Sequence, residues 1–423
     1  MFGAPPAIFG LCAVIFLALH VFRININSLN VFIMAAAAFA AAYAAAFAYF
    51  YSADYEVFTG GLIARRASML VFSALCFMVV FALRRKKHGS YFFPAVSAIM
   101  FIIAAAIQAG DIPTQAAAFF SADLFSVLIK KKETEAWEGV PEEAVTNKLL
   151  HLMPAAAFLM LFMAARGEPK LLKLGFNGMI FMLVLSCVSG FFTVTSNELP
   201  SAKQKFIGPG ALSGFIPVLA QFVIICGMIR QNGGLLIGSF MTSGVILLLI
   251  LAAFKSITEE KYQFFAVRDS YILFYLGLLG ISCANLSPLD VAVYSVLYAI
   301  SAANALEALG GPNSARQTMT NIKYSFEKIQ DNMYIFASMA AGLCAEIYIF
   351  TAIYTNLKND SLIHAVLLIG AALYSPAFLN KLFTIFSMAK RMKPARGLKG
   401  VFGVNSVIMI LFLGMAAAML YKW

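Results

Sequence analysis

The 423-residue chain is 61% hydrophobic and only 12% charged, and it carries a formal net charge of +11. Apolar runs of about 20 residues, the length that crosses a bilayer as a helix, recur from end to end. The polar gaps between them are only loop-sized, so the composition excludes a separate water-soluble catalytic domain. It indicates an all-α polytopic membrane protein.

Fourteen membrane-spanning helices are predicted from the hydropathy pattern. In chain order they cover residues 4–22, 30–51, 67–83, 91–109, 112–129, 141–165, 174–196, 211–229, 233–254, 263–284, 289–309, 332–355, 362–389 and 400–421. The first run lacks a basic leader and is followed by further spans. We therefore interpret it as a retained helix and not as a signal peptide.

Lysine and arginine are concentrated in the odd-numbered loops between these spans, for example at 84–87, 130–132 and 390–399. By the positive-inside rule, both termini then face away from the cytoplasm. The positive charge thus follows topology, and we expect no nucleic-acid partner. The strip at 390–399 fits anionic lipid headgroups or an acidic partner subunit.

Asp123 lies inside an apolar run, where an ionised carboxylate is costly unless it has a partner or a function. Lys148 follows on the next predicted helix. Asp123 lies seven residues before Lys130, and Lys148 lies seven residues after Pro141. At 1.5 Å per residue both side chains start about 10 Å from the same membrane face. A helical hairpin would place the two charges at matching depth, either as a working pair or as a pair that only locks two helices together.

His151 lies three residues after Lys148, on the same helix face. It could extend a proton path, because histidine exchanges protons near neutral pH. The alternative is a structural histidine that bonds a carbonyl loosened by Pro154. Further along, Gln221 is a hydrogen-bonding group without charge in the middle of its span.

Charged residues return in the later spans. For Arg268 and Asp269, near the basic end of their helix, we expect a local ion pair. Glu346 lies near the middle of an apolar helix, and Lys381 and His364 are its expected polar neighbours. An early and a late buried acid, one in each of two similar-sized halves, is the layout of an internally repeated transporter.

The six cysteines each lie alone in an apolar run and lack the spacing of a metal site, so we interpret them as packing residues. They are Cys12, Cys76, Cys187, Cys226, Cys283 and Cys344.

Five motifs follow one another along the predicted spans: Asp123–Ser126, Lys148, Gly208–Phe215, Tyr298–Ala305 and Ala341–Glu346. Together they resemble the antiporter-like subunits of respiratory complex I, most closely its N-type subunit, and their relatives in membrane-bound hydrogenases and multisubunit cation/proton antiporters. Asp123–Ser126 stands where that family has Glu-Leu-Leu-Ser, Lys148 stands at the family's next-helix lysine, and Tyr298–Ala305 resembles the family's eleventh helix. Gly208–Phe215 is similar to the segment that opens the family's eighth helix. Ala341–Glu346 is similar to Ala-Gly-Phe-Ile-Gly followed by Lys or Glu.

The resemblance implies two inverted five-helix repeats, helices 4–8 and 9–13. The chain would divide into a three-helix segment at 1–90, repeats at 91–230 and 231–390, and a C-terminal helix at 391–423. It also implies a row of buried groups that relays protons while a redox partner supplies the energy. The relay candidates are Asp123, Lys148, His151, Gln221, Glu346 and Lys381.

The departures from the family pattern concern the centre of this relay. Phe191 and Gln221 stand where the family has its two central lysines, and a phenylalanine cannot exchange protons. Phe336–Met339 stands where the family breaks its twelfth helix, so we expect that helix to be unbroken here. Either protons still pass through a degenerate relay, or the relay is cut and the subunit is a scaffold.

The leading functional hypothesis is an antiporter-like membrane subunit of a complex-I-like or hydrogenase-like assembly that translocates protons or sodium. The alternative is a free-standing secondary transporter that couples a cation or proton to a polar solute. The sequence has no catalytic or phosphate-binding motif, so we expect no catalysis by this chain alone. Flavin, iron–sulfur and quinone sites are expected only in partner subunits of the membrane arm. The expected location is a bacterial or archaeal cytoplasmic membrane.

Overall fold

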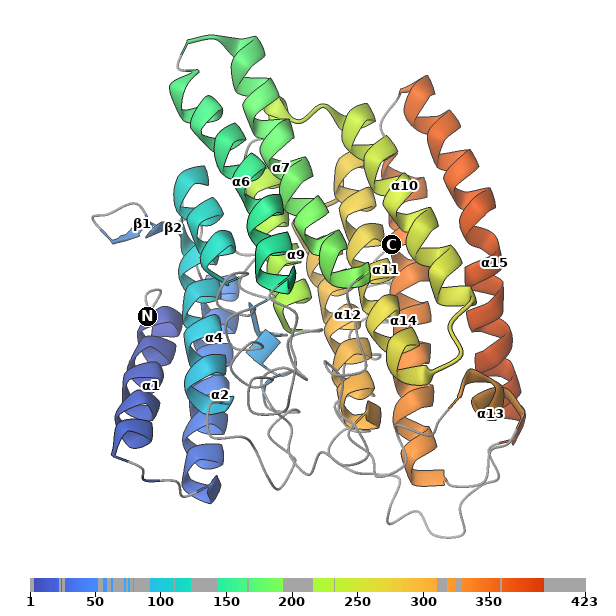
Figure 1. The fold of residues 1–423 in the computed structure, drawn as a ribbon, viewed down its shortest axis with the longest axis horizontal. Coiled ribbons are helices and arrows are strands. Elements are labelled where there is room, and N and C mark those ends of the chain that lie inside the picture. Colours follow the sequence, from blue (N-terminus) through green and yellow to red (C-terminus); the bar gives the residue numbers. More distant parts are fainter. Residues whose placement is uncertain are drawn as a thin grey trace.

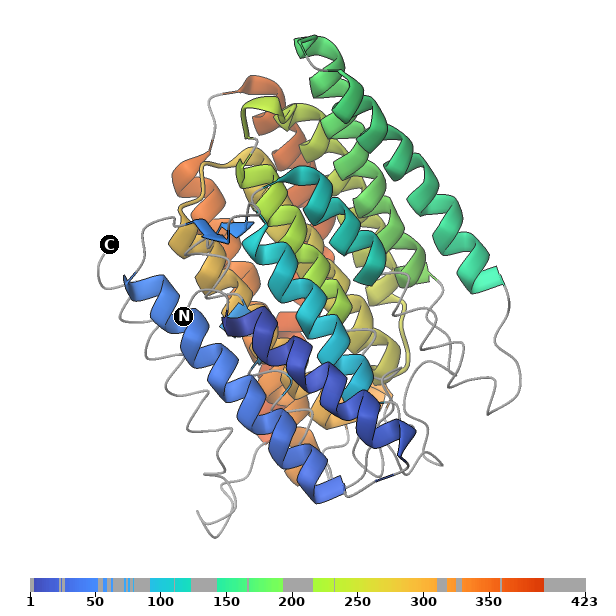
Figure 2. The same ribbon diagram turned by 90° about the vertical axis from the view of Figure 1, so that its left-hand side faces the viewer.

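The computed structural model describes residues 4–22, 24, 27–51, 56–58, 62–63, 72–73, 75–76, 79, 92–109, 111–122, 143–165, 167–192, 216–231, 233–309, 318–324, 329–357 and 360–391. Within these residues nearly the whole chain is helical, and the helices run alongside one another in an elongated bundle (Figures 1 and 2). Seven of the described helices are long and apolar enough to cross a membrane, and three shorter apolar helices accompany them. The protein is therefore an integral membrane protein.

The first part of the bundle contains α1 (Ala4–Val21), α2 (Asn27–Tyr51), α4 (Phe92–Gln108), α6 (Glu143–Ala164), α7 (Pro169–Phe192) and α9 (Ile216–Gln231). Residues 112–122 are also helical. Helix α1 packs against α2 and α4, and α6 packs along α7. The strands β1 (Glu56–Phe58) and β2 (Leu62–Ile63) pair antiparallel between α2 and α4, which is a small departure from the all-α expectation. This pairing satisfies backbone N–H and C=O groups in a segment that is not helical.

The second part contains the short 3₁₀ helix η1 (Gly233–Leu235), then α10 (Gly238–Ile257), α11 (Tyr262–Cys283), α12 (Pro288–Leu309), α13 (Met319–Tyr324), α14 (Ile329–Asn356) and α15 (Ser361–Arg391). The expected unbroken helix is confirmed by α14. The predicted start of the seventh span at residue 174 was wrong, because α7 begins at Pro169. Proline favours a first helical turn, and hydropathy marks the lipid-buried stretch and not the end of a helix.

The predicted span at 400–421 lies outside the described residues, and the span at 67–83 is described at only a few positions. The count of fourteen, the inverted repeats and the domain boundaries therefore stay predictions.

Helix α11 forms the centre of the second part. Its apolar residues surround the helix instead of forming one stripe, as in a helix that is enclosed on all sides. Accordingly, every residue of α11 except Phe264 is buried, and the helix packs against α9, α10, α12 and α14. A charged side chain on this helix must find its partners inside the protein.

Two polar contacts fix the neighbours of α11. Asn177 on α7 donates to the Leu235 carbonyl at 2.8 Å and accepts from the Ile237 N–H at 2.8 Å, which ties α7 to the start of α10. Ser301 on α12 and Ser338 on α14 each donate to the other's carbonyl oxygen at 2.9 Å. Such small hydroxyl residues allow membrane helices to approach closely.

Candidate functional site

Three charged side chains from three helices meet in the interior of the second part. The Lys381 ammonium on α15 donates to both carboxylate oxygens of Asp269 on α11, each at 2.8 Å, and to Glu346 Oε1 on α14 at 2.7 Å. Lys381, Asp269 and Glu346 are 3%, 6% and 0% exposed. We call these three residues the charge cluster. Charges at such depth persist only when they are paired, and here one cation serves two anions.

Gly342 gives the cluster its space. It lies one turn before Glu346 on α14, and the Lys381 ammonium occupies the space where a side chain at this position would begin. A Cβ atom at this position would lie 2.6 Å from Lys381 Nζ and 3.1 Å from Asp269 Oδ2. A glycine is therefore needed here for α14 to approach the ion pair.

The charges within the cluster do not balance. With both carboxylates ionised and the lysine protonated, the three side chains carry a net charge of −1. Among the described residues, none donates a well-formed hydrogen bond to Glu346 Oε2, although Tyr374 on α15 lies beside this carboxylate. A buried uncompensated charge is unfavourable, and a carboxylate relieves it by taking up a proton. The arrangement can therefore hold one exchangeable proton, with Glu346 Oε2 as the available atom.

The expected local ion pair between Arg268 and Asp269 is wrong. The Arg268 guanidinium forms an ion pair with Glu259 and lies 3.4 Å from the Lys255 carbonyl, at the end of α11 nearest α10. Asp269 points to Lys381 instead. Consecutive residues on a helix do not face each other, which separates the two partners.

The expected contact of His364 with Glu346 is also wrong. His364 is exposed in the first turn of α15, where its Nδ1 lies 2.6 Å from the Asp360 carbonyl oxygen. Lys381 lies seventeen residues further along the helix, about 25 Å away at 1.5 Å per residue. The expected contact between Lys381 and Glu346, in contrast, is confirmed.

Most of the candidate relay residues in the first half lie outside the part of the chain that the structure describes. Asp123 lies outside the described residues. Lys148 and His151 lie on α6 and Phe191 on α7, but their side chains fall outside the described part of the chain. Gln221 is buried on α9. The pairing of Asp123 with Lys148 thus stays a prediction.

Asp290 is a further buried acid, and the sequence reading did not single it out. Its carboxylate accepts from the Ser287 N–H at 2.8 Å, the Ser287 hydroxyl at 2.7 Å and the Tyr348 hydroxyl at 2.9 Å. The Asp290 N–H also approaches the Ser287 hydroxyl oxygen at 3.1 Å. The reciprocal bonds form a capping box at the start of α12. The Ser-Pro-Leu-Asp sequence was the available signal.

The predicted packing role of the cysteines agrees with the burial of Cys12, Cys76, Cys226 and Cys283. Cys344 is exposed on α14, and Cys187 lies outside the described side chains.

Comparison with known proteins supplies a fold but no close relative. No family model and no curated protein matches the sequence. A chain of the membrane-bound sulfane sulfur reductase, an archaeal respiratory membrane complex, is similar over 100% of this chain and 95% of its own, with a TM-score of 0.74 at 12% identity.

Two further structures are similar to most of the chain. A chain of the Mrp complex from Dietzia sp. DQ12-45-1b matches 92% of this chain and 79% of its own, with a TM-score of 0.63 at 12% identity. A chain of respiratory complex I from Thermus thermophilus matches 91% and 95%, with a TM-score of 0.63 at 10% identity. The resemblance inferred from the sequence motifs is therefore confirmed at the level of the fold.

Proposed function

We propose that this chain is an antiporter-like membrane subunit of a complex-I-like, ion-translocating oxidoreductase, and that its charge cluster takes up and releases one proton. The charge cluster is the observation that carries the proposal. It combines two acids and one base, all buried, in a fold shared with chains of a respiratory sulfane sulfur reductase, an Mrp complex and complex I. Intramembrane ionisable groups of this kind mark ion pathways by default.

Lys381 gives the cluster two arrangements. With Glu346 ionised, the ammonium is shared between Glu346 and Asp269, at 2.7 and 2.8 Å. When Glu346 gains a proton, its attraction for the ammonium falls, and Asp269 alone holds Lys381. Groups that interact this strongly titrate as one unit. A movement of the Lys381 ammonium would therefore accompany each proton transfer. This movement could be transmitted to neighbouring helices.

The likenesses to chains of multisubunit assemblies support a complex subunit, and no observation favours a free-standing transporter. The proposal places flavin, iron–sulfur and quinone chemistry in partner subunits. It also places the protein in a bacterial or archaeal cytoplasmic membrane, with both termini facing away from the cytoplasm and with anionic lipids at residues 390–399.

The test begins with extraction in mild detergent and identification of the proteins that stay bound. In the reconstituted assembly, Glu346→Gln and Asp269→Asn should each lower the number of protons moved per electron while electron transfer continues. Tyr354→Phe, about two turns beyond Glu346 on an exposed face of α14, is the matched control and should leave the ratio unchanged. An unaltered ratio in both acid variants would instead identify a scaffold subunit.

A further inference from the structure

We infer that the Tyr374 hydroxyl is the positioning group for the proton of Glu346: it donates to Glu346 Oε2 when this carboxylate is ionised and accepts from it when the acid is protonated. The inference rests on the proposed function and adds to it the residue that faces the proton. The other oxygen, Oε1, accepts from the Lys381 ammonium at 2.7 Å. The two oxygens of Glu346 therefore have different partners and different tasks.

The place of Tyr374 on α15 directs its side chain into the bundle. Its neighbours Leu373 and Ser375 are exposed, whereas Tyr374 is only 3% exposed. Lys381 lies seven residues further along α15, which is two helical turns on the same face. Since Lys381 contacts Glu346 on α14, Tyr374 faces the same helix.

Phe350 places the Tyr374 ring next to Glu346. It lies one turn after Glu346 on α14, and its ring centroid lies 5.8 Å from that of Tyr374. The Lys381 ammonium meets α14 one turn before Glu346, at Gly342. Glu346 thus lies between these two contacts, and the Tyr374 hydroxyl lies beside its carboxylate.

The hydrogen-bonding capacity of a tyrosine differs from that of a lysine. An ammonium group has three donors and no acceptor, so Lys381 can stabilise an ionised Glu346 but cannot accept the proton of the acid. A hydroxyl both donates and accepts. By rotating its O–H bond, Tyr374 can serve both protonation states of Glu346 while its ring stays in place.

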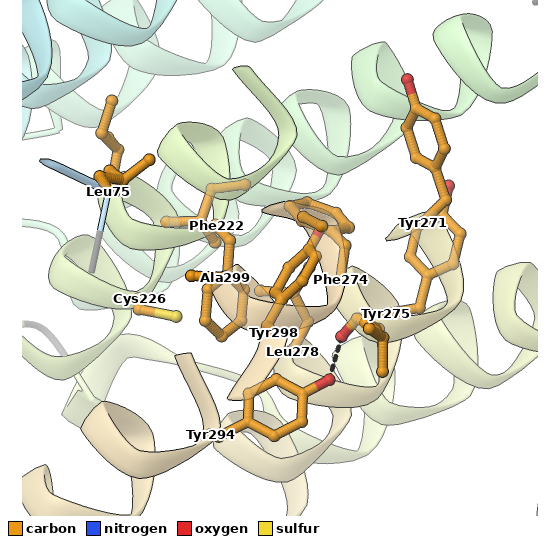
Figure 3. Close-up of a cluster of buried hydrophobic side chains, with 14 of the residues drawn as sticks. Leu75, Phe222, Cys226, Tyr271, Phe274, Tyr275, Leu278, Tyr294, Tyr298 and Ala299 are labelled. Atoms are coloured by element: carbon orange, nitrogen blue, oxygen red, sulfur yellow. Dashed lines mark hydrogen bonds between the residues drawn. The ribbon is translucent and has the colours of Figure 1, made fainter. Parts of the chain in front are cut away.

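Tyr294 is a second buried tyrosine within electrostatic reach of Glu346. Figure 3 shows its hydroxyl directed at the backbone of α11, where it donates to the Leu273 carbonyl (dashed line). Gly277 lets the ring pack against this helix, because a Cβ atom there would lie 2.6 Å from the Tyr294 ring. A hydroxyl has one proton, so Tyr294 does not donate to Glu346 in this arrangement.

Pro376 lies between Tyr374 and Lys381 on α15. A proline has no backbone N–H, so it leaves the Ala372 carbonyl without its helical partner, and the Ser375 hydroxyl donates to this carbonyl at 2.8 Å instead. Helices bend most readily at such interruptions. The part of α15 that carries Lys381 can therefore shift while Tyr374 stays in place.

The experiment follows the C=O band of protonated Glu346 by infrared difference spectroscopy between high and low pH. The full-length chain is reconstituted in liposomes, and the band is identified by its loss in Glu346→Gln. Tyr374→Phe keeps a ring against Phe350 but removes the hydroxyl. The acid O–H then loses its acceptor, the C=O bond stiffens, and we expect the band to shift to a higher wavenumber. Tyr354→Phe, on an exposed face of α14, is the matched control and should leave the band unchanged.

An unshifted band in folded Tyr374→Phe would overturn the inference and leave the proposed function standing. A second measurement needs no Tyr374 variant. With isotope-labelled tyrosine, the wild type should show a tyrosine C–O signal on protonation that disappears in Glu346→Gln. The same tyrosine signal in both proteins, or none in the wild type, would also overturn the inference. A missing Glu346 carboxyl band at every pH would refute the proposed function as well, because Glu346 would then hold no proton.

Discussion

Replacing Lys381 with methionine tests the charge cluster directly. Methionine approximates the length of lysine but has no charge, and the change removes the contacts to Asp269 and Glu346 at 2.7–2.8 Å. It leaves two buried carboxylates without the cation that both contact. Removing one partner of a buried ion pair costs about 3–5 kcal/mol. Because one lysine serves two acids here, we expect a loss of stability in the upper part of that range.

Unfolding of the purified full-length chain by SDS in mixed micelles, followed by circular dichroism, measures this loss. Lys390→Met is the matched control, because it removes an exposed lysine from the same helix and should change stability by less than about 0.5 kcal/mol. A triple variant that also carries Asp269→Asn and Glu346→Gln should recover much of the stability, since no unpaired charge remains buried. The reasoning fails if Lys381→Met behaves like Lys390→Met, or if the triple variant is no more stable than Lys381→Met.

Two further substitutions test the packing around the cluster and the junction of the halves. Gly342→Ala should push the Lys381 ammonium away from α14, because the new Cβ atom would lie 2.6 Å from the ammonium nitrogen. The assembly should then move fewer protons per electron. An unchanged ratio would contradict this prediction. Asn177→Leu should leave the part-buried Leu235 carbonyl and Ile237 N–H without their partner, and because water reaches these groups in part we expect a loss of about 1 kcal/mol for each. The same SDS unfolding experiment measures that loss, and a variant as stable as the wild type would show that water replaces the side chain.

Most of the described helices could be predicted from the sequence because the chain lies in a membrane. Lipid offers no hydrogen bonds, so an apolar run of sufficient length becomes a helix whatever its neighbours are. The predicted spans therefore correspond to α1, α11 and α14, and α14 is unbroken as expected. Helix ends were less predictable, as the start of α7 at Pro169 shows, because a helix can extend into the interface beyond its apolar stretch.

The site was predictable in part. Glu346 and Lys381 were recognisable because charges in apolar spans are rare and need a reason. Asp269 was assigned to its neighbour Arg268, since both lie near a basic helix end where a local explanation suffices. The missed signal was that α11 is apolar on every face. A charged residue such as Asp269 on this helix therefore has no water-exposed face and needs a partner inside the protein. Asp123, Lys148 and His151 stay predictions.

The sequence alone determined that this chain is a bundle of membrane helices with buried charges. Whether a segment spans the bilayer depends on its own length and polarity, and both can be read from the sequence. Only the tertiary structure decided which charges meet. The charge cluster combines residues of α11, α14 and α15, namely Asp269, Glu346 and Lys381. The spacing of these residues in the sequence does not determine how each helix is rotated about its axis. That rotation follows from close contacts such as those at Gly342 and Gly277, where the missing side chains let neighbouring helices and rings fit together.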